Sequence, residues 1–187
     1  MFKVGIENID LYLDLFKDKK VGLITNPTGV DRNFKSTIDI LKEKTELVSL
    51  YAPEHGVRGD LQAGVRLENY HDEETGCMVY SLYGQNKKPS YEMLKDIDIL
   101  CFDIQDVGAR FYTFIYTMAY AMMAAKEFNK KFVVFDRPNP VGGVEVEGNI
   151  LDLKYRSFVG YYPLVQRYGL TIGELAMMFN DAYEIGC

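Results

Sequence analysis

One stretch in the middle of the chain limits the possible folds more than any other. Residues 97–104 are mostly apolar and β-branched, which is typical of a short strand buried on both faces. Polar and small residues follow at 105–110, and residues 111–125 then form a helix-length segment without a single charge. A buried strand, a polar turn and a buried helix make half of a parallel α/β unit. The stretch therefore predicts an α/β fold.

The same alternation of strands and helices recurs along the chain. Further strands are predicted at 21–25, 45–52, 78–83 and 131–136. Helices are predicted at 5–17, after Ser36, at 90–96 and after Thr171, with an irregular connection over 141–170. We therefore expect a three-layer αβα domain with a mainly parallel sheet of five or six strands.

Composition excludes several classes of protein. The 187 residues suit one domain, and 48% of them are hydrophobic, so disorder is not expected. A net charge of −6 without a cluster of basic residues argues against nucleic acid or an anionic membrane surface as a partner. The longest uncharged run is too short for a membrane span, and no secretory signal begins the chain. A cytoplasmic location is the default expectation, and a mature exported form is the alternative.

Cofactors receive no support from sequence motifs. The chain contains neither G-x-G-x-x-G nor a P-loop, and it has no G-x-S-x-G serine elbow. Its three cysteines are far apart and are expected to be free thiols. Two histidines cannot make a His-rich metal site, although Asp103, Asp106 and Asp136 could hold Mg²⁺ as a minority alternative. We predict no cofactor and no resident metal.

Four of the predicted strands end in unusual polar segments. These are NPTG at 26–29, PEHG at 53–56, DIQDVGAR at 103–110 and DRPNP at 136–140. Ligands of parallel sheets bind beyond the carboxyl ends of the strands, so we expect the four segments to form one shared site. Glycine and proline also shape ordinary turns, which explains each segment singly but not the acids, arginines and histidine that recur in them.

Carboxylates carry most of the chemistry that these segments could perform. Glu54 lies between Pro53 and the His55–Gly56 pair, where it could donate a proton to a leaving oxygen. Asp106 or Asp103 could supply the second carboxylate that glycoside cleavage usually needs. The structural alternatives are that Glu54 is a loop acid, that Asp106 caps the following helix, and that Arg110 pairs with Asp103.

Arginines and tyrosines near the strand ends are candidate binding residues. Arg58, Arg110 and Arg137 could hold an anionic group of a substrate, with salt bridges as the alternative for each. Aromatic rings could stack on a sugar or belong to the core; the candidates are Tyr80, Tyr83 and Tyr112.

The motifs at these strand ends resemble a known family. The segments NPTG, PEHGVRGD, TGCMVYSLYG, DIQDVGARFYT, FDRPNPVGG and RYGLTIGELA occur in the same order in the exo-β-N-acetylmuramidases of the NamZ type, formerly a domain of unknown function. The resemblance covers about residues 21–176. It implies a Rossmann-like N-terminal domain, followed in the family by a smaller C-terminal domain with the active site between them. The implied activity is release of N-acetylmuramic acid from the non-reducing end of peptidoglycan fragments.

The resemblance also ranks the site residues. Glu54 becomes the leading catalytic acid, with His55 and Asp106 beside it. The candidate substrate-binding residues that the resemblance implies are Asn26, Arg58, Arg110, Tyr112, Arg137 and Asn139. Asp103 and Gln105 are added because they lie at the end of the central strand. The lactyl carboxylate of N-acetylmuramic acid would give the arginines a purpose.

The chain stops soon after its last predicted helix, where members of the family continue. We therefore expect residues 1–187 to form only the N-terminal domain, with the C-terminal domain absent. If the uncharged helix at 111–125 faces that domain, an apolar patch should be exposed and the chain should self-associate. Two rival functions stay open: a non-catalytic module that binds muramyl sugars, and a Mg²⁺-dependent phosphohydrolase.

Overall fold

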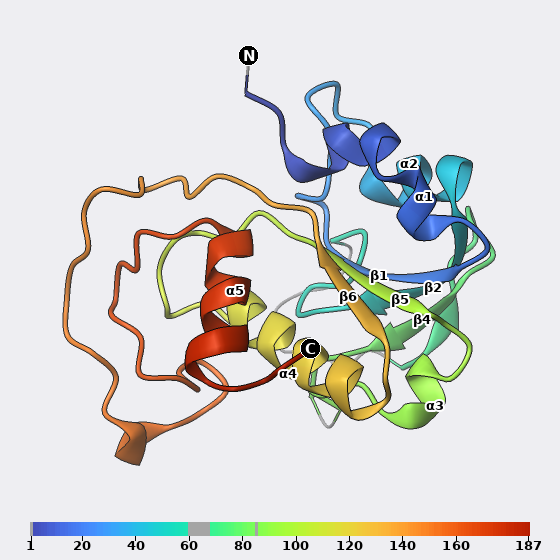
Figure 1. Cartoon of the computed structure of the whole chain (residues 1–187). Helices are drawn as coiled ribbons and strands as arrows, with labels where there is room; N and C mark the ends of the chain where they lie inside the picture. The colour runs from blue at the N-terminus through green and yellow to red at the C-terminus, as the bar shows by residue number, and fades with distance from the viewer. Residues whose placement is uncertain (1, 60–67, 85) are drawn as a thin grey trace.

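The computed structural model describes residues 2–59, 68–84 and 86–187 and shows a six-stranded sheet (Figure 1). The strand order is β3-β4-β2-β1-β5-β6, and only the β3–β4 pair is antiparallel. The strands are β1 (Lys20–Thr25), β2 (Glu46–Ala52), β3 (Tyr70–His71), β4 (Met78–Ser81), β5 (Ile99–Asp103) and β6 (Lys131–Val134). The predicted α/β fold with a mainly parallel sheet is confirmed.

Helices cover both faces of this sheet. One face carries the 3₁₀ helix η1 (Gly5–Leu11), α1 (Leu13–Phe16) and α2 (Thr37–Lys44). The opposite face carries α3 (Tyr91–Leu94), α4 (Phe114–Glu127) and α5 (Ile172–Ala182), while the 3₁₀ turn η2 (Leu153–Tyr155) lies in the connection before α5. The predicted three layers are therefore present, and Figure 1 shows α2 and α5 on opposite sides of the strands.

A hydrophobic core lies on each face of the sheet, and strand β5 contributes side chains to both. All its residues are buried, and successive side chains point to opposite faces of the sheet. Leu100 and Phe102 pack under α4 and α5, whereas Ile99 and Cys101 pack under α2 and η1. The sheet is thus buried on both faces, as the near-continuous apolar run predicted.

The strand order reverses beside β1. From β1 the chain crosses through α2 to β2 on one side, and from the adjacent β5 it crosses through α4 to β6 on the other. The carboxyl ends of two strands with opposite crossovers leave a crevice between them, which is where open α/β sheets bind ligands. Residues 26–29 and 104–110 occupy that position.

Some boundaries differ from the sequence-based expectation. The helix predicted at 5–17 is a 3₁₀ helix followed by a single α-helical turn, because the chain breaks at Tyr12. Helix α4 begins at Phe114, three residues later than predicted, because residues 108–113 form a turn. The loop predicted to follow β2 contains the short strand β3, while its residues 60–67 lie outside the described part of the chain.

An exposed apolar patch was expected if the uncharged helix faced a missing domain, and in the described structure that condition is not met by α4. Helix α4 is buried along most of its length between the sheet and α5. Exposed apolar side chains gather instead on the long connection between β6 and α5, which arches away from the sheet in orange in Figure 1. They are Val141, Val144, Val146, Ile150, Leu153, Tyr155 and Val159.

Strand β6 forms one edge of the sheet. Its Phe132 and Val134 are partly exposed, and they line a groove of about 520 Å³ with Met122 of α4 and Met177 of α5. Among the described residues, no helix is long and apolar enough to cross a membrane.

Candidate functional site

Three of the four predicted strand-end segments meet around Gln105. Its backbone N–H donates to Thr28 Oγ1 at 2.9 Å, and its side-chain amide donates to Pro138 O at 2.8 Å. The Thr28 backbone N–H in turn donates to Asn26 Oδ1 at 3.0 Å. The ends of β1, β5 and β6 are therefore joined by hydrogen bonds at one edge of the sheet, as the sequence predicted.

The fourth segment carries Glu54, which is half-buried at the end of β2. Thr113 Oγ1, at the start of α4, donates to Glu54 Oε2 at 3.1 Å. Tyr83, which follows β4, also interacts with the Glu54 carboxyl group, and this interaction raises the pKa of Tyr83. Glu54 therefore lies where β2, β4 and α4 come together.

His55 has an unusual backbone conformation. Its φ is 76°, in the left-handed region that a residue with a Cβ rarely adopts, and Gly56 continues there at 81°. Strain of this kind is kept where the surrounding structure enforces it and is frequent at functional sites. The exposed His55 side chain lies directly beside Glu54 in sequence, so the turn presents both groups at the sheet edge.

Asp106 is only 4% exposed. Its Oδ2 accepts hydrogen bonds from Gly108 N at 2.8 Å and from the hydroxyl of Tyr168, while its Oδ1 has no partner within the described chain. Burial raises the pKa of Asp106. The prediction that Asp106 caps the following helix is wrong, since Thr113 occupies the capping position directly before α4 and Asp106 holds the turn that precedes it.

Asp103 is fully buried and is held by Arg137. The guanidinium binds it with two nitrogens, Nη2 at 3.0 Å from Oδ2, and Thr37 Oγ1 donates to the same oxygen. The predicted pairing of Asp103 with Arg110 is therefore wrong. Burying a charge requires a close partner, and Arg137 is near enough to provide one.

The arginines are engaged within the protein. Arg58 binds Asp72 through two nitrogens, at 2.8 and 3.0 Å, and Arg137 binds Asp103. Arg110 is buried, and its Nη1 donates to the backbone carbonyls of Asn149 and Leu164 at 2.6 and 2.5 Å. Arg58 and Arg137 therefore form the salt bridges given as their structural alternative, whereas Arg110 is held by backbone carbonyls and not by a carboxylate.

The minority magnesium site is also not assembled. Asp103 is bound by Arg137, and Asp136 accepts hydrogen bonds from Thr171 Oγ1 at 3.0 Å and Gly173 N at 2.7 Å at the start of α5. Within residues 2–59, 68–84 and 86–187, no three His, Cys, Asp or Glu side chains lie close enough together to hold a metal ion.

The remaining predicted residues divide between surface and core. Tyr112 is 45% exposed beside the site, whereas Tyr80 stacks on the buried Tyr51 with ring centroids 5.6 Å apart. Asn139 donates to Leu170 O at 2.9 Å and connects the end of β6 to the segment before α5.

The family of this chain follows from comparison with known proteins. A family model described as the N-terminal part of the exo-β-N-acetylmuramidase NamZ matches residues 21–187. The chain belongs to the NamZ family. The resemblance drawn from the strand-end motifs is thus confirmed.

Relatives of this NamZ family member are about twice as long. A peptidoglycan β-N-acetylmuramidase NamZ from Bacillus subtilis (strain 168) is 59% identical over 176 residues, which cover 93% of this chain and 42% of the relative. Two crystal structures of DUF1343 family proteins from Bacteroides fragilis NCTC 9343 have TM-scores of 0.89 and 0.83 at 53% and 40% identity. The match to the first structure covers 97% of this chain and 46% of that protein. The match to the second covers 96% of this chain and 47% of that protein.

Two groups around the NamZ carboxylates escaped the sequence analysis. Thr113 lies inside the uncharged segment predicted as a helix and directly before Phe114, where α4 begins, so a search of that segment for helix-capping residues could have found it. Tyr168 reaches Asp106 across 62 residues of sequence, and no local pattern indicates such a contact.

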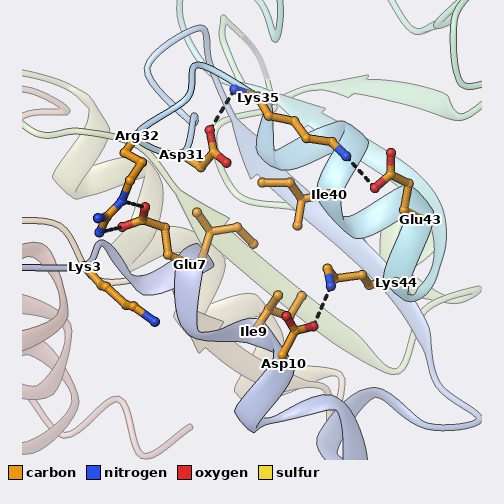
Figure 2. A pocket seen from close by; sticks show the side chains of 11 residues that line it. Lys3, Glu7, Ile9, Asp10, Asp31, Arg32, Lys35, Ile40, Glu43 and Lys44 are labelled. Atoms are coloured by element: carbon orange, nitrogen blue, oxygen red, sulfur yellow. Dashed lines mark hydrogen bonds and ion pairs between the residues drawn. The ribbon is translucent and has the colours of Figure 1, made fainter.

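A charged hollow lies away from these residues, between η1 and α2 (Figure 2). It has a volume of about 390 Å³ and is bridged by ion pairs, among them Lys44–Asp10 and Arg32–Glu7. The pairs join η1 to α2 and to the loop before it, so a structural role accounts for them.

Proposed function

We propose that this chain carries the proton-donating carboxylate of a glycoside hydrolase that releases N-acetylmuramic acid from the non-reducing end of peptidoglycan fragments. Membership of the NamZ family and the named Bacillus subtilis relative support the reaction class. The chain spans less than half the length of these relatives, so the activity of this chain itself is part of the proposal.

The observation that carries the proposal is the setting of Glu54. It is half-buried at the carboxyl end of β2, where Thr113 donates to it and Tyr83 interacts with it, and it lies beside the strained His55. A general acid must reach the leaving oxygen of the substrate, and Glu54 is partly open to solvent whereas Asp106 is not. Accessibility therefore favours Glu54 as the acid, although burial gives Asp106 the raised pKa.

The residues around Glu54 then position the site and are available to contact the substrate. Asp106 and Gln105 hold the turn after β5, and the exposed Tyr112 is available to a sugar ring. Arg110 fastens the connection at 149–164 to that turn. His55, exposed beside Glu54, would orient the glutamate or the sugar.

The test is steady-state hydrolysis of a muramyl glycoside with a poor leaving group. Glu54→Gln should lower kcat roughly a hundred- to ten-thousandfold, the usual contribution of general acid catalysis, with the fold retained. Glu46→Gln, at the opposite end of the same strand, is the matched control and should leave kcat unchanged. Wild-type kcat in Glu54→Gln would remove Glu54 from this role and make Asp106 the next candidate.

A binding module without turnover is the second candidate. It is supported if N-acetylmuramic acid binds the chain by calorimetry while no sugar release is detected from the glycoside. A phosphohydrolase would instead release phosphate in a Mg²⁺-dependent reaction that a chelator abolishes, and the engaged carboxylates of Asp103 and Asp136 argue against it.

A further inference from the structure

Three side chains from separate parts of the chain converge at the end of β2. Glu54 follows β2, Tyr83 follows β4, and Thr113 directly precedes α4. Thr113 Oγ1 donates to Glu54 Oε2 at 3.1 Å, and the same carboxyl group raises the pKa of Tyr83. The Thr113 hydroxyl therefore donates to the Glu54 carboxylate, and the Tyr83 hydroxyl interacts with the same group from a different part of the chain.

The Thr113 hydroxyl does not cap α4, the helix that Thr113 precedes. A threonine at the N-terminal position of a helix usually accepts a hydrogen bond from a backbone N–H of the first turn. Thr113 makes no such bond, and its backbone is already helical, with φ −75° and ψ −22°. Its carbonyl accepts from Thr117, so the helix is anchored through the backbone while the hydroxyl is directed to Glu54.

Helix α4 also has no acidic residue in its first turn. Negative charge is stabilising near a helix N-terminus. Glu54, bound to Thr113 directly before α4, brings that charge from the loop after β2. This contact alone would stabilise the helix, so a structural role of Glu54 and its positioning for catalysis differ in what a loss of the Thr113 hydroxyl does to turnover.

We propose that Thr113 and Tyr83 are positioning residues for Glu54. Their hydroxyls hold the carboxyl group in one orientation at the sheet edge and stabilise the carboxylate that remains after Glu54 has given its proton to the leaving oxygen. This inference rests on the proposed function for its catalytic meaning. The contact itself can be tested without activity.

The first experiment follows Tyr83 by NMR in the chain labelled with ¹³Cζ-tyrosine. Because the interaction with Glu54 raises the pKa of Tyr83, Glu54→Gln should lower it toward the ordinary tyrosine value. Tyr91, exposed on α3 near the amino ends of the strands, is the internal control and should not move. A Tyr83 titration that is unchanged in Glu54→Gln would overturn the proposal.

The second readout is the side-chain order of Glu54. In the wild type its two γ-methylene protons should have distinct chemical shifts, as expected for one fixed rotamer. In the double variant Tyr83→Phe/Thr113→Val the two shifts should converge, while Thr113→Ser, which keeps the hydroxyl, should preserve them. Distinct shifts in the double variant would show that other contacts fix Glu54 and would overturn the proposal.

The third experiment is kinetic and uses the muramyl glycoside with the poor leaving group. Tyr83→Phe and Thr113→Val should each lower kcat roughly ten- to a hundredfold, the worth of one hydrogen bond to a charged group, with KM within about twofold. Thr113→Ser should restore kcat, and Tyr91→Phe should not change it. If both single variants keep wild-type kcat while Glu54→Gln loses it, positioning fails and the proposed function stands. If Glu54→Gln keeps its activity, the proposed function fails, and the two NMR readouts alone decide whether the hydroxyls hold Glu54.

Discussion

Arg137 is the partner that makes the burial of Asp103 possible. Replacing Arg137 by leucine would leave the Asp103 carboxylate buried with only the Thr37 hydroxyl as a side-chain donor. Removing one member of a buried ion pair costs about 3–5 kcal/mol of unfolding free energy. We expect a loss of this size for Arg137→Leu in urea unfolding followed by circular dichroism.

An exposed ion pair provides the control for that measurement. Lys88 and Glu127 form a salt bridge in which both side chains are about half exposed. Lys88→Met should change the unfolding free energy by about 1 kcal/mol or less. If both variants lost the same unfolding free energy, burial would not determine how much the Asp103–Arg137 pair stabilises the protein.

Asp72 makes the unfolding free energy of the protein depend on pH in the acid range. Arg58 binds its carboxylate and, with Thr75, lowers the pKa of Asp72 from 3.8 to about 2. The folded state therefore releases this proton more readily than the unfolded state, so the stabilisation is complete above about pH 5 and is lost as the pH falls toward 2. Partial exposure of Arg58 screens the pair, which leaves a contribution on the order of 1–2 kcal/mol.

The measurement is the free energy of unfolding between pH 2 and pH 7. Asp72→Asn should lower it at neutral pH and reduce its dependence on pH below 5. Glu73→Gln, at the exposed neighbouring position, should follow the wild-type curve. Parallel curves for wild type and Asp72→Asn would contradict the assignment.

At the scale of elements, α5 is tied to the end of β6 through Thr171, the capping residue directly before the helix. Thr171 Oγ1 accepts from Glu174 N at 3.1 Å and donates to Asp136 Oδ2 at 3.0 Å, while Glu174 Oε2 accepts from Thr171 N. Thr171→Ala removes this cap and should cost about 1 kcal/mol in chemical unfolding. Thr171→Ser should retain most of it, and an unaffected Thr171→Ala would show that packing alone holds α5.

The elements that sequence predicted well are those with local signals. The caps at Ser36 and Thr171 and the apolar run of β5 were confirmed, because each depends on neighbouring residues. Residues 5–17 were mispredicted, since apolar spacing does not distinguish a 3₁₀ helix from an α-helix interrupted at Tyr12. The shared edge of the site was predicted from topology, whereas the Tyr168–Asp106 contact depends on folding of the whole chain and was not.

At the scale of the whole molecule, the connection between β6 and α5 presents apolar side chains to water. Val144 is 91% exposed and Ile150 is 62% exposed. An exposed apolar surface of this kind favours association. We expect the chain to self-associate at high concentration, and Val144→Lys/Ile150→Lys to weaken this in sedimentation velocity.

Phe34 provides the control, because it is 85% exposed on a different loop. Phe34→Lys should leave the association unchanged. A wild-type chain that stays monomeric over the whole concentration series would contradict the expectation.

The free side of β6 has a consequence for how this molecule behaves while it folds. A strand with an open side presents hydrogen-bonding groups that can pair with any extended polypeptide, and charged or proline residues usually discourage this. In β6 only Lys131 is charged, and the following Phe132 and Val134 are partly exposed beside an apolar groove. During refolding at high concentration, β6 of one molecule can therefore pair with an extended segment of another, and this pairing competes with native folding. The recovered yield should depend more on protein concentration than on time.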